Sequence, residues 1–223
     1  MRKDIQANMP IIAYDSYRFL YPPRPDRAVS PSRLSDYDNG EFLCEFKLDG
    51  DCACVFTNGI ETVVKDRHGN SFKKDTRALE AIAKTLHRGN GWIGICAEWL
   101  CKSKKNSLGA NANGNLVLWD LIILNGCILT NYSHESRKQL LDDLYATGDH
   151  SEPFLLATDN PHVQVVKHYL GNFENAYDSI LKVPMIEGLV LKKRKALLEL
   201  GLSESNNART MLKFRKPTEN YHY

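Results

Sequence analysis

The sequence has no hydrophobic run that approaches the roughly 20 residues of a membrane-spanning helix. No apolar stretch follows the first residues, Met1-Arg2-Lys3-Asp4, so we expect no secretory signal peptide. Net charge is also small, because 29 lysines and arginines against 27 acidic residues leave a formal charge of +2. These features predict a cytoplasmic protein that does not enter membranes. Any surface that binds nucleic acid must be local rather than a consequence of bulk charge.

The spacing of zinc ligands is missing as well. Neither the pair Cys52 and Cys54 nor the pair Cys96 and Cys101 has the spacing of a zinc ribbon. Most of the cysteines lie inside apolar, strand-like runs, and no export signal directs the chain to an oxidising compartment. The six are therefore predicted to be reduced thiols of the core: Cys44, Cys52, Cys54, Cys96, Cys101 and Cys127.

The first 40 residues differ in composition from the rest of the chain. They are rich in proline, tyrosine, arginine and aspartate, with Pro22-Pro23-Arg24-Pro25 at the centre. Proline lacks a backbone N–H and restricts the residue before it, so neither a helix nor a central strand is expected here. We predict an extended arm over residues 1–40, packed on a single domain that spans residues 41–223.

Hydrophobic periodicity predicts both strands and helices within that domain. Helices are expected over 75–87, over 173–181, and from a cap at Ser133 to Tyr145. Asn58-Gly59 is typical of a tight hairpin turn. The expected strands are 42–46, 52–56, 60–65, 92–100, 116–124, 186–192 and 211–216. Mixed elements with early hairpins predict an α+β fold with antiparallel sheets.

One lysine stands out by its surroundings, in the run Glu45-Phe46-Lys47-Leu48-Asp49-Gly50 at the end of an expected strand. A lysine in such a place is usually only a solvated charge. A lysine amine attacks as a nucleophile only when it is neutral, a form favoured by nearby cations or by desolvation. A site that gathers a metal ion and several lysines and arginines around a phosphate would provide those conditions.

The remainder of the chain offers residues for such a site. Arginine follows the hairpin, carboxylates stand in or beside apolar strands, and an aromatic residue precedes an aspartate. Buried carboxylates are rare unless they are paired or bind metal, so these acids need partners. Lys213 and Arg215 share one face of a strand because side chains alternate with a period of two. The runs are Lys65–Asn70 with Arg67, Ile95–Trp99 with Glu98, Val117–Gly126 with Trp119, Glu187–Lys192, and Leu212–Pro217.

In order and wording, these motifs resemble the covalent nucleotidyltransferase superfamily, which comprises ATP-dependent DNA and RNA ligases and messenger-RNA capping enzymes. The resemblance extends from Glu45 to Pro217. It implies an α+β nucleotidyltransferase domain, ATP-grasp-like, built of two antiparallel β-sheets flanked by helices. The oligonucleotide-binding (OB-fold) barrel that follows this domain in cellular ligases and capping enzymes has no counterpart in the sequence, so we expect no OB-fold domain.

The resemblance also implies the residues that carry the chemistry. Lys47 would attack the α-phosphorus of ATP and hold AMP through a phosphoramidate bond. Lys213 and Arg215 would neutralise the α-phosphate as charge builds in the transition state. Glu187 would bind the divalent metal, Mg²⁺ or Mn²⁺. Asp49 would act close to these residues or in a later step.

A second group of residues would bind the nucleotide. Glu45 lies where the adenine pocket of the family begins, and Trp119 would stack on adenine. Glu98 would hydrogen-bond the ribose hydroxyl, and Arg67 would contact the ribose and the incoming 5′-phosphate. Lys192 is the last member of this group.

Simpler interpretations remain open for several of these residues. Trp119 could be a core aromatic and Arg67 a surface charge of the hairpin. Strict alternation from Glu187 would turn Lys192 to the opposite face. Two clusters are candidates for contacts with backbone phosphates: Lys193-Arg194-Lys195, expected beside the metal carboxylate, and Lys102, Lys104 and Lys105 in an expected loop.

The sequence departs from the family pattern at two positions. Cys52 stands where many DNA ligases have arginine, and Arg215 replaces the second lysine of the usual Lys-x-Lys, which keeps the charge but changes its geometry.

The function expected from the resemblance is that of an ATP-dependent polynucleotide ligase, DNA favoured, that seals nicked duplex nucleic acid as a monomer. The run from Trp119 to Gly126, followed by Ser136–Leu141, favours DNA over RNA or a hybrid. The alternatives are an RNA ligase, a GTP-dependent capping guanylyltransferase and a non-catalytic nucleic-acid clamp. The compact size suggests a phage-encoded protein acting in the host cytoplasm, by analogy only.

Overall fold

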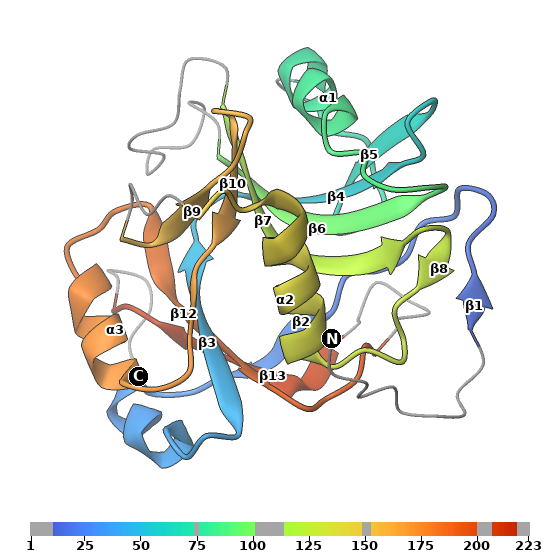
Figure 1. Cartoon of the computed structure of the whole chain (residues 1–223). Helices are drawn as coiled ribbons and strands as arrows, with labels where there is room; N and C mark the ends of the chain where they lie inside the picture. The colour runs from blue at the N-terminus through green and yellow to red at the C-terminus, as the bar shows by residue number, and fades with distance from the viewer. Residues whose placement is uncertain (1–10, 74–75, 101–113, 149–152, 200–206, 218–223) are drawn as a thin grey trace.

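The computed structural model describes residues 11–73, 76–100, 114–148, 153–199 and 207–217. Two β-sheets stand side by side in the described part of the chain, with helices packed against them (Figure 1). The α+β class expected from the sequence is confirmed. Lys102, Lys104 and Lys105 lie outside the described residues.

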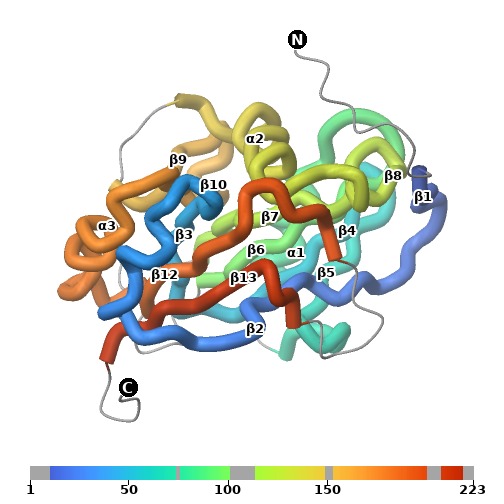
Figure 2. The backbone as a smooth tube through the Cα atoms, turned by 90° about the horizontal axis from the view of Figure 1, so that it is seen from below, coloured from blue at the N-terminus to red at the C-terminus, as the bar shows by residue number. Residues whose placement is uncertain are grey.

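The five-stranded sheet has the order β11-β3-β12-β13-β2. Its strands are β11 (His168–Tyr169), β3 (Phe42–Leu48), β12 (Ile186–Lys193), β13 (Asn207–Arg215) and β2 (Arg24–Ala28). Neighbours are antiparallel except β2, which runs parallel to β13 and beside it (Figure 2).

Eight strands form the second sheet, within the described residues. The path β1-β8-β7-β6-β4-β5 is antiparallel, whereas β10 pairs in parallel with β7 and carries β9 on its other side. Purely antiparallel sheets were expected, and this detail is wrong in both sheets. Here the chain crosses over through helix α2 before β10 returns alongside β7, and a crossover connection permits parallel pairing. The strands are β1 (Ile12–Ala13), β4 (Asp51–Thr57), β5 (Thr62–Asp66), β6 (Ile93–Leu100), β7 (Asn115–Leu124), β8 (Cys127–Ile128), β9 (Leu155–Ala157) and β10 (Val163–Val166).

The three expected helices are present with small shifts at their ends. Helix α2 (His134–Tyr145) begins as predicted, because the Ser133 hydroxyl accepts a hydrogen bond from the Ser136 backbone N–H at 3.2 Å. Helix α3 covers Phe173–Ile180. Helix α1 covers Thr76–Lys84 and ends earlier than expected, since the next two backbone N–H groups bond three residues back in tighter turns.

The described part of the proline-rich arm contributes more structure than expected. It supplies β1 and β2 to the two sheets and forms a 3-10 helix over Pro31–Tyr37, so the exclusion of any helix from this segment is wrong. Proline is tolerated at the first position of the 3-10 helix because the backbone N–H that it lacks would make no hydrogen bond within the helix there. Pro25 lies in β2, at the edge of its sheet, where proline is tolerated.

The first hairpin has a longer loop than the Asn58-Gly59 signal predicts. Asn58 Oδ1 accepts hydrogen bonds from the backbone N–H groups of Ile60 at 3.0 Å and Glu61 at 2.7 Å, which closes a four-residue loop. The returning strand β5 therefore starts at Thr62 rather than at Ile60. Gly59 has φ +86°, a conformation that glycine adopts without strain.

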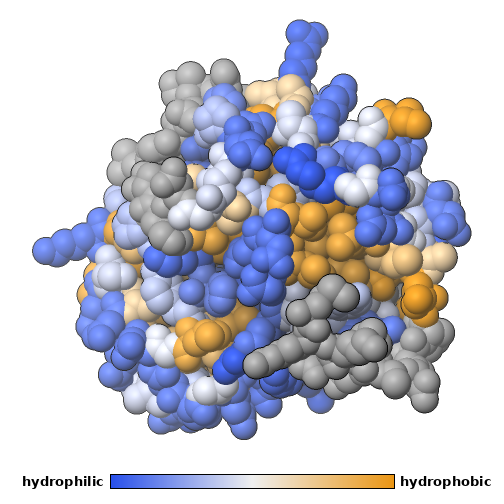
Figure 3. Space-filling model, viewed as in Figure 1, coloured by the Kyte–Doolittle hydropathy of each residue, from blue (hydrophilic) through white to orange (hydrophobic). Residues whose placement is uncertain are grey.

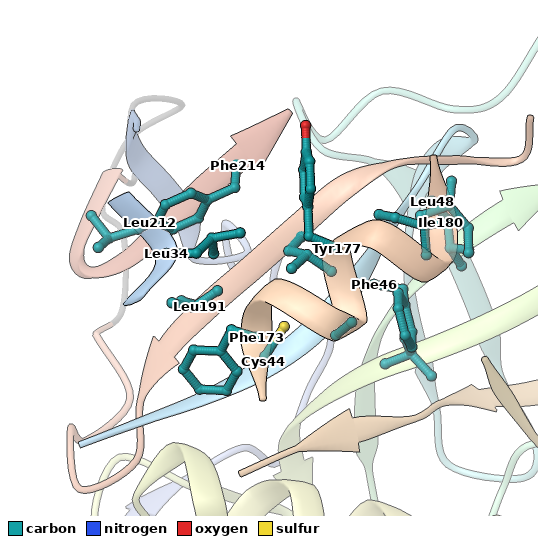
Figure 4. Close-up of a cluster of buried hydrophobic side chains, with 14 of the residues drawn as sticks. Leu34, Cys44, Phe46, Leu48, Phe173, Tyr177, Ile180, Leu191, Leu212 and Phe214 are labelled. Carbon is teal, nitrogen blue, oxygen red and sulfur yellow. The ribbon is translucent and has the colours of Figure 1, made fainter. Parts of the chain in front are cut away.

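Each sheet buries one face against helices. The side chains of β3, β12 and β13 that face α3 and the 3-10 helix form one core, drawn with Cys44, Phe173 and Phe214 among its labelled members (Figure 4). A second core lies between the larger sheet and α1 and α2, and a third packs that sheet against the arm through Tyr14 and Leu20. The opposite faces of β3, β12 and β13 are thereby left for polar side chains.

Two further expectations concern the cysteines and the membrane. The five cysteines among the described residues are free thiols; Cys44, Cys54 and Cys96 are buried as predicted, whereas Cys52 and Cys127 are only partly buried. Hydrophilic residues cover most of the face shown in Figure 3. None of the helices in the described ranges is long and apolar enough to span a membrane.

Candidate active site

A cleft of about 1170 Å³ lies between the two sheets. The chain passes from one sheet to the other at Asp49-Gly50, which joins β3 to β4. The Asp49 backbone N–H donates to the Met185 carbonyl at 2.9 Å, and the Gly50 N–H donates to Glu98 Oε1 at 3.0 Å. A Cβ at Gly50 would lie 2.5 Å from Glu98 Cγ and 2.8 Å from the Trp99 carbonyl oxygen, so only glycine fits this crossing.

Every site residue expected from the sequence lines this cleft. They come from six segments that are separated by up to about 170 positions along the chain, and the two sheets bring them together. The ten are Glu45, Lys47, Asp49, Arg67, Glu98, Trp119, Glu187, Lys192, Lys213 and Arg215. Their placement agrees with the expectation, while the role of each remains a prediction.

Lys47 stands at the end of β3, directly beside the start of β12. Its ammonium group forms an ion pair with Glu187 Oε2, 140 residues away in sequence. Arg215 Nη2 lies 4.0 Å from the same oxygen. The expected nucleophile, metal ligand and transition-state cation therefore share one small region of the cleft.

A β-bulge allows Glu187 and Lys192 to face the cleft together. The register between β3 and β12 shifts between Ile186 and Gly188, so the alternation that begins at Glu187 is reset. A Cβ at Gly188 would lie 1.9 Å from the Phe214 carbonyl oxygen, which requires glycine there. The sequence-based concern that Lys192 points to the opposite face is thus wrong.

Lys192 and Glu45 form a buried ion pair beneath Trp119. The two charged atoms lie 2.7 Å apart, with both side chains no more than 4% exposed. Lys192 Nζ also donates to the Trp119 carbonyl at 3.2 Å and lies 5.1 Å from the centre of the indole ring. Burial raises the pKa of Glu45, and Lys192 and Lys138 oppose that shift. The second oxygen, Oε1, is buried with no hydrogen-bond partner among the described residues.

Behind Trp119, a second charged network is fully enclosed. Arg137 of α2 donates two hydrogen bonds, of 2.9 and 3.0 Å, to the Asp120 carboxylate and contacts His134 Nδ1 at 2.7 Å. Burial would raise the pKa of Asp120, but Arg137 and Lys192 outweigh it and lower the value to about 2. Burial and Arg137 lower the pKa of His134 to about 3. Helix α2 thus fixes the strand that presents Trp119.

Cations gather on one side of the cleft. Burial lowers the pKa of Lys213, and the charges of Arg215, Lys47 and Arg24 lower it further. Sequence reasoning missed Arg24, because this arginine lies in the proline-rich arm and belongs to no motif of the family. The signal that could have indicated Arg24 in the sequence was its position between two prolines, Pro23 and Pro25.

Arg67 lies at the rim and is exposed. Its Nε donates to His68 Nε2 at 2.9 Å, and Asp66 Oδ1 shapes the turn by accepting from the His68 and Asn70 backbone N–H groups at 2.8 Å each. The guanidinium is therefore presented at the mouth of the cleft rather than in its floor.

The cluster Lys193-Arg194-Lys195 does not lie beside Glu187, and that expectation is wrong. Lys193 ends β12, whereas Glu187 is the second residue of that strand, about 20 Å away along an extended chain. Arg194 is held by Glu135 and by the Gly40 carbonyl, and Lys195 Nζ lies 3.3 Å from Glu135 Oε2.

For a metal ion, the described residues contain no group of three or more histidine, cysteine, aspartate or glutamate side chains that could hold one. A Mg²⁺ ion at a phosphate-transfer site usually takes one or two carboxylates and completes its shell with phosphate oxygens and water. Glu187, which lines the cleft, fits that kind of site.

The comparisons with known proteins concern the fold. No model of a protein family matches the sequence, and no curated protein does. Solved structures do match. The ligase domain of M. tuberculosis LigD matches at 18% identity and a TM-score of 0.65, and the match covers 89% of this chain and 61% of that one. Mycobacterial DNA ligase D complexed with ATP matches at 17% identity and a TM-score of 0.63, covering 87% and 60%. A Lig E DNA ligase, described as binding DNA with a minimal scaffold, matches at 18% and 0.52, covering 87% and 68%.

The chain therefore spans about three fifths of the length of the first two ligases. Each identity is below 20%, so the likeness concerns the fold. This chain has the fold of the adenylylation domain of ATP-dependent DNA ligases.

Proposed function

We propose that the chain is an ATP-dependent polynucleotide ligase, with DNA as the favoured substrate, that works through a lysyl-AMP intermediate. One observation carries the proposal: the ten motif residues, spread from Glu45 to Arg215, line one cleft with Lys47 and Glu187 in contact. A lysine that is only a solvated surface charge would not be expected to share a cleft with these residues.

In the first step, the Lys47 amine attacks the α-phosphorus of ATP. A nitrogen–phosphorus bond forms, the bond from the α-phosphorus to the bridging oxygen of the β-phosphate breaks, pyrophosphate leaves, and the nitrogen gives up a proton. Lys213 and Arg215 line the cleft and would place two cations where negative charge builds on the α-phosphate oxygens. A Mg²⁺ or Mn²⁺ ion held by Glu187 and phosphate oxygens would supply further charge neutralisation.

The base would bind in the part of the cleft that Trp119 and Glu45 line. The half-buried indole offers a stacking surface. Glu45 Oε1 is a buried acceptor without a partner among the described residues, and a buried acceptor is costly until a donor reaches it. The exocyclic amine of adenine is such a donor. Glu98, fixed by its bond to the Gly50 N–H, lies where a ribose hydroxyl could donate to it.

The second and third steps would join two ends of a nick. The 5′-phosphate oxygen attacks the phosphorus of lysyl-AMP, which releases Lys47 and leaves AMP on the 5′ end. The 3′-hydroxyl then attacks the 5′-phosphorus, loses its proton and expels AMP as the strand closes. Arg67, exposed at the rim, is suited to bind the incoming 5′-phosphate.

A nick-sealing assay with all-DNA, all-RNA and mixed-strand duplexes tests the substrate. We expect sealing of the all-DNA nick with ATP and a divalent metal. Preference for the RNA nick would make the chain an RNA ligase, covalent labelling with GTP alone would identify a guanylyltransferase, and nick binding without labelling would indicate a clamp.

A further inference from the structure

The arm before the domain contributes a cation to the active-site cleft. Arg24 lines the cleft together with Asp26, two residues further along β2. Arg27, on the same strand, instead lines a separate cavity of about 330 Å³ with Phe42 and Lys193. The strand thus divides its two arginines between two places, and only Arg24 faces the nucleotide site.

The order of the strands sets the position of Arg24 relative to the reacting groups. Lys47 lies on β3, Lys213 on β13 and Arg24 on β2, in a sheet of order β3-β12-β13-β2. In the register, Lys213 pairs with Ala28 and Arg24 with Asn207, so Arg24 lies one strand beyond Lys213 and further along the sheet from Lys47. The distance across the sheet from β3 to β2 is about 14 Å at the usual spacing of neighbouring strands. The charge of Arg24 reaches Lys213, whose pKa it helps to lower.

In phosphoryl transfer the attacking atom and the leaving oxygen are roughly in line on opposite sides of the phosphorus. If the α-phosphate rests beside Lys213, the pyrophosphate must point away from Lys47 and across the sheet. That direction leads toward β2. Pro23 and Pro25 restrict the backbone on both sides of Arg24, so binding has to order only its side chain.

We propose that Arg24 binds the β- and γ-phosphates of ATP and the pyrophosphate that leaves when Lys47 is adenylylated. The inference rests on the proposed function and assigns the leaving-group site within it. Arginine suits this task because its planar fork can donate two hydrogen bonds to phosphate oxygens.

The test compares ATP with AMP, because only ATP carries the phosphates that Arg24 would bind. Affinities for both nucleotides are measured by calorimetry with Mg²⁺, on the full chain carrying Lys47→Ala so that no ATP is consumed. We expect Arg24→Ala to weaken ATP binding about 10- to 100-fold and AMP binding less than about twofold. Arg27→Ala, on the same strand, should change neither affinity.

Equal losses for ATP and AMP would overturn the assignment, because they would show that Arg24 only supports the fold, for example through Asp26. Unchanged ATP binding would overturn it too. If Arg24→Ala does not fold, Arg24→Gln is used instead, and its loss of ATP affinity is compared with its loss of AMP affinity in the same way. The proposed function is tested separately, by adenylylation of the chain with Lys47 intact. If that chain is labelled but Arg24→Ala weakens ATP and AMP binding equally, only the Arg24 site is refuted. If the chain with Lys47 is not labelled, both proposals are refuted.

Discussion

Lys192 Nζ lies 2.7 Å from Glu45 Oε2 in the floor of the cleft, where water scarcely reaches either side chain. The pair joins β12 to β3 and supports the underside of Trp119. Its second carboxylate oxygen has no hydrogen-bond partner among the described residues. A buried ion pair of this kind contributes little net stability, but it is costly to break from one side.

Replacing only Lys192 should therefore destabilise the protein strongly. Lys192→Met leaves the Glu45 carboxyl group buried without its partner, and we expect a loss of about 3–5 kcal/mol in the free energy of unfolding. The double variant with Glu45→Gln should recover part of that loss. Denaturant unfolding measures both, with the exposed Lys182→Met as the control. A loss of less than about 1 kcal/mol for Lys192→Met would contradict a buried pair.

The bulge at Gly188 should tolerate no side chain. Because a Cβ would meet the Phe214 carbonyl oxygen at 1.9 Å, Gly188→Ala must displace β13 or abolish the register shift. We expect a loss of at least about 3 kcal/mol in the free energy of unfolding. Gly171→Ala is the control, since its nearest contact would be Asp38 Oδ1 at 3.3 Å. Equal, small effects of the two substitutions would refute the bulge geometry.

The sequence predicted the helices and the set of cleft residues because each has a local signal. Ser133 caps α2 through its own hydroxyl, and the Lys47 motif has a characteristic order of residues. The direction of Lys192 could not be predicted in this way, because it depends on a register shift against another strand. Arg24 and the burial of Arg137 were missed for the same reason, since a partner distant in sequence decides where each charge lies.

Stability should fall as the pH drops below neutrality, through His134. Burial and Arg137 lower the pKa of His134 from 6.5 to about 3 in the folded protein. The contribution of neutral, buried His134 to the free energy of unfolding is fully present above pH 6.5. It is lost as the pH falls from 6.5 toward 3, by up to about 1.4 kcal/mol per pH unit. His134→Gln should flatten this dependence in unfolding curves recorded from pH 7 to pH 4. A slope unchanged by the substitution would show that His134 does not carry it.

Trp119 should contribute to nucleotide binding rather than only to the core. Trp119→Ala should lose about 1–3 kcal/mol of ATP-binding free energy, in line with base–aromatic stacking, and Trp119→Phe should keep most of it. Calorimetric titration with ATP gives the two values, and circular dichroism confirms that the variants are folded. Unchanged ATP affinity in folded Trp119→Ala would assign the indole to packing with Lys192 alone.

The most direct test of the account is the mass of the protein after incubation with ATP and Mg²⁺. Attack by Lys47 predicts a gain of one adenylyl group, located on the peptide that contains Lys47. Lys47→Ala should gain none, and Lys47→Arg should also fail, because arginine stays protonated and cannot attack. An unlabelled wild-type chain, or undiminished labelling of Lys47→Ala, would contradict the central claim that Lys47 carries AMP.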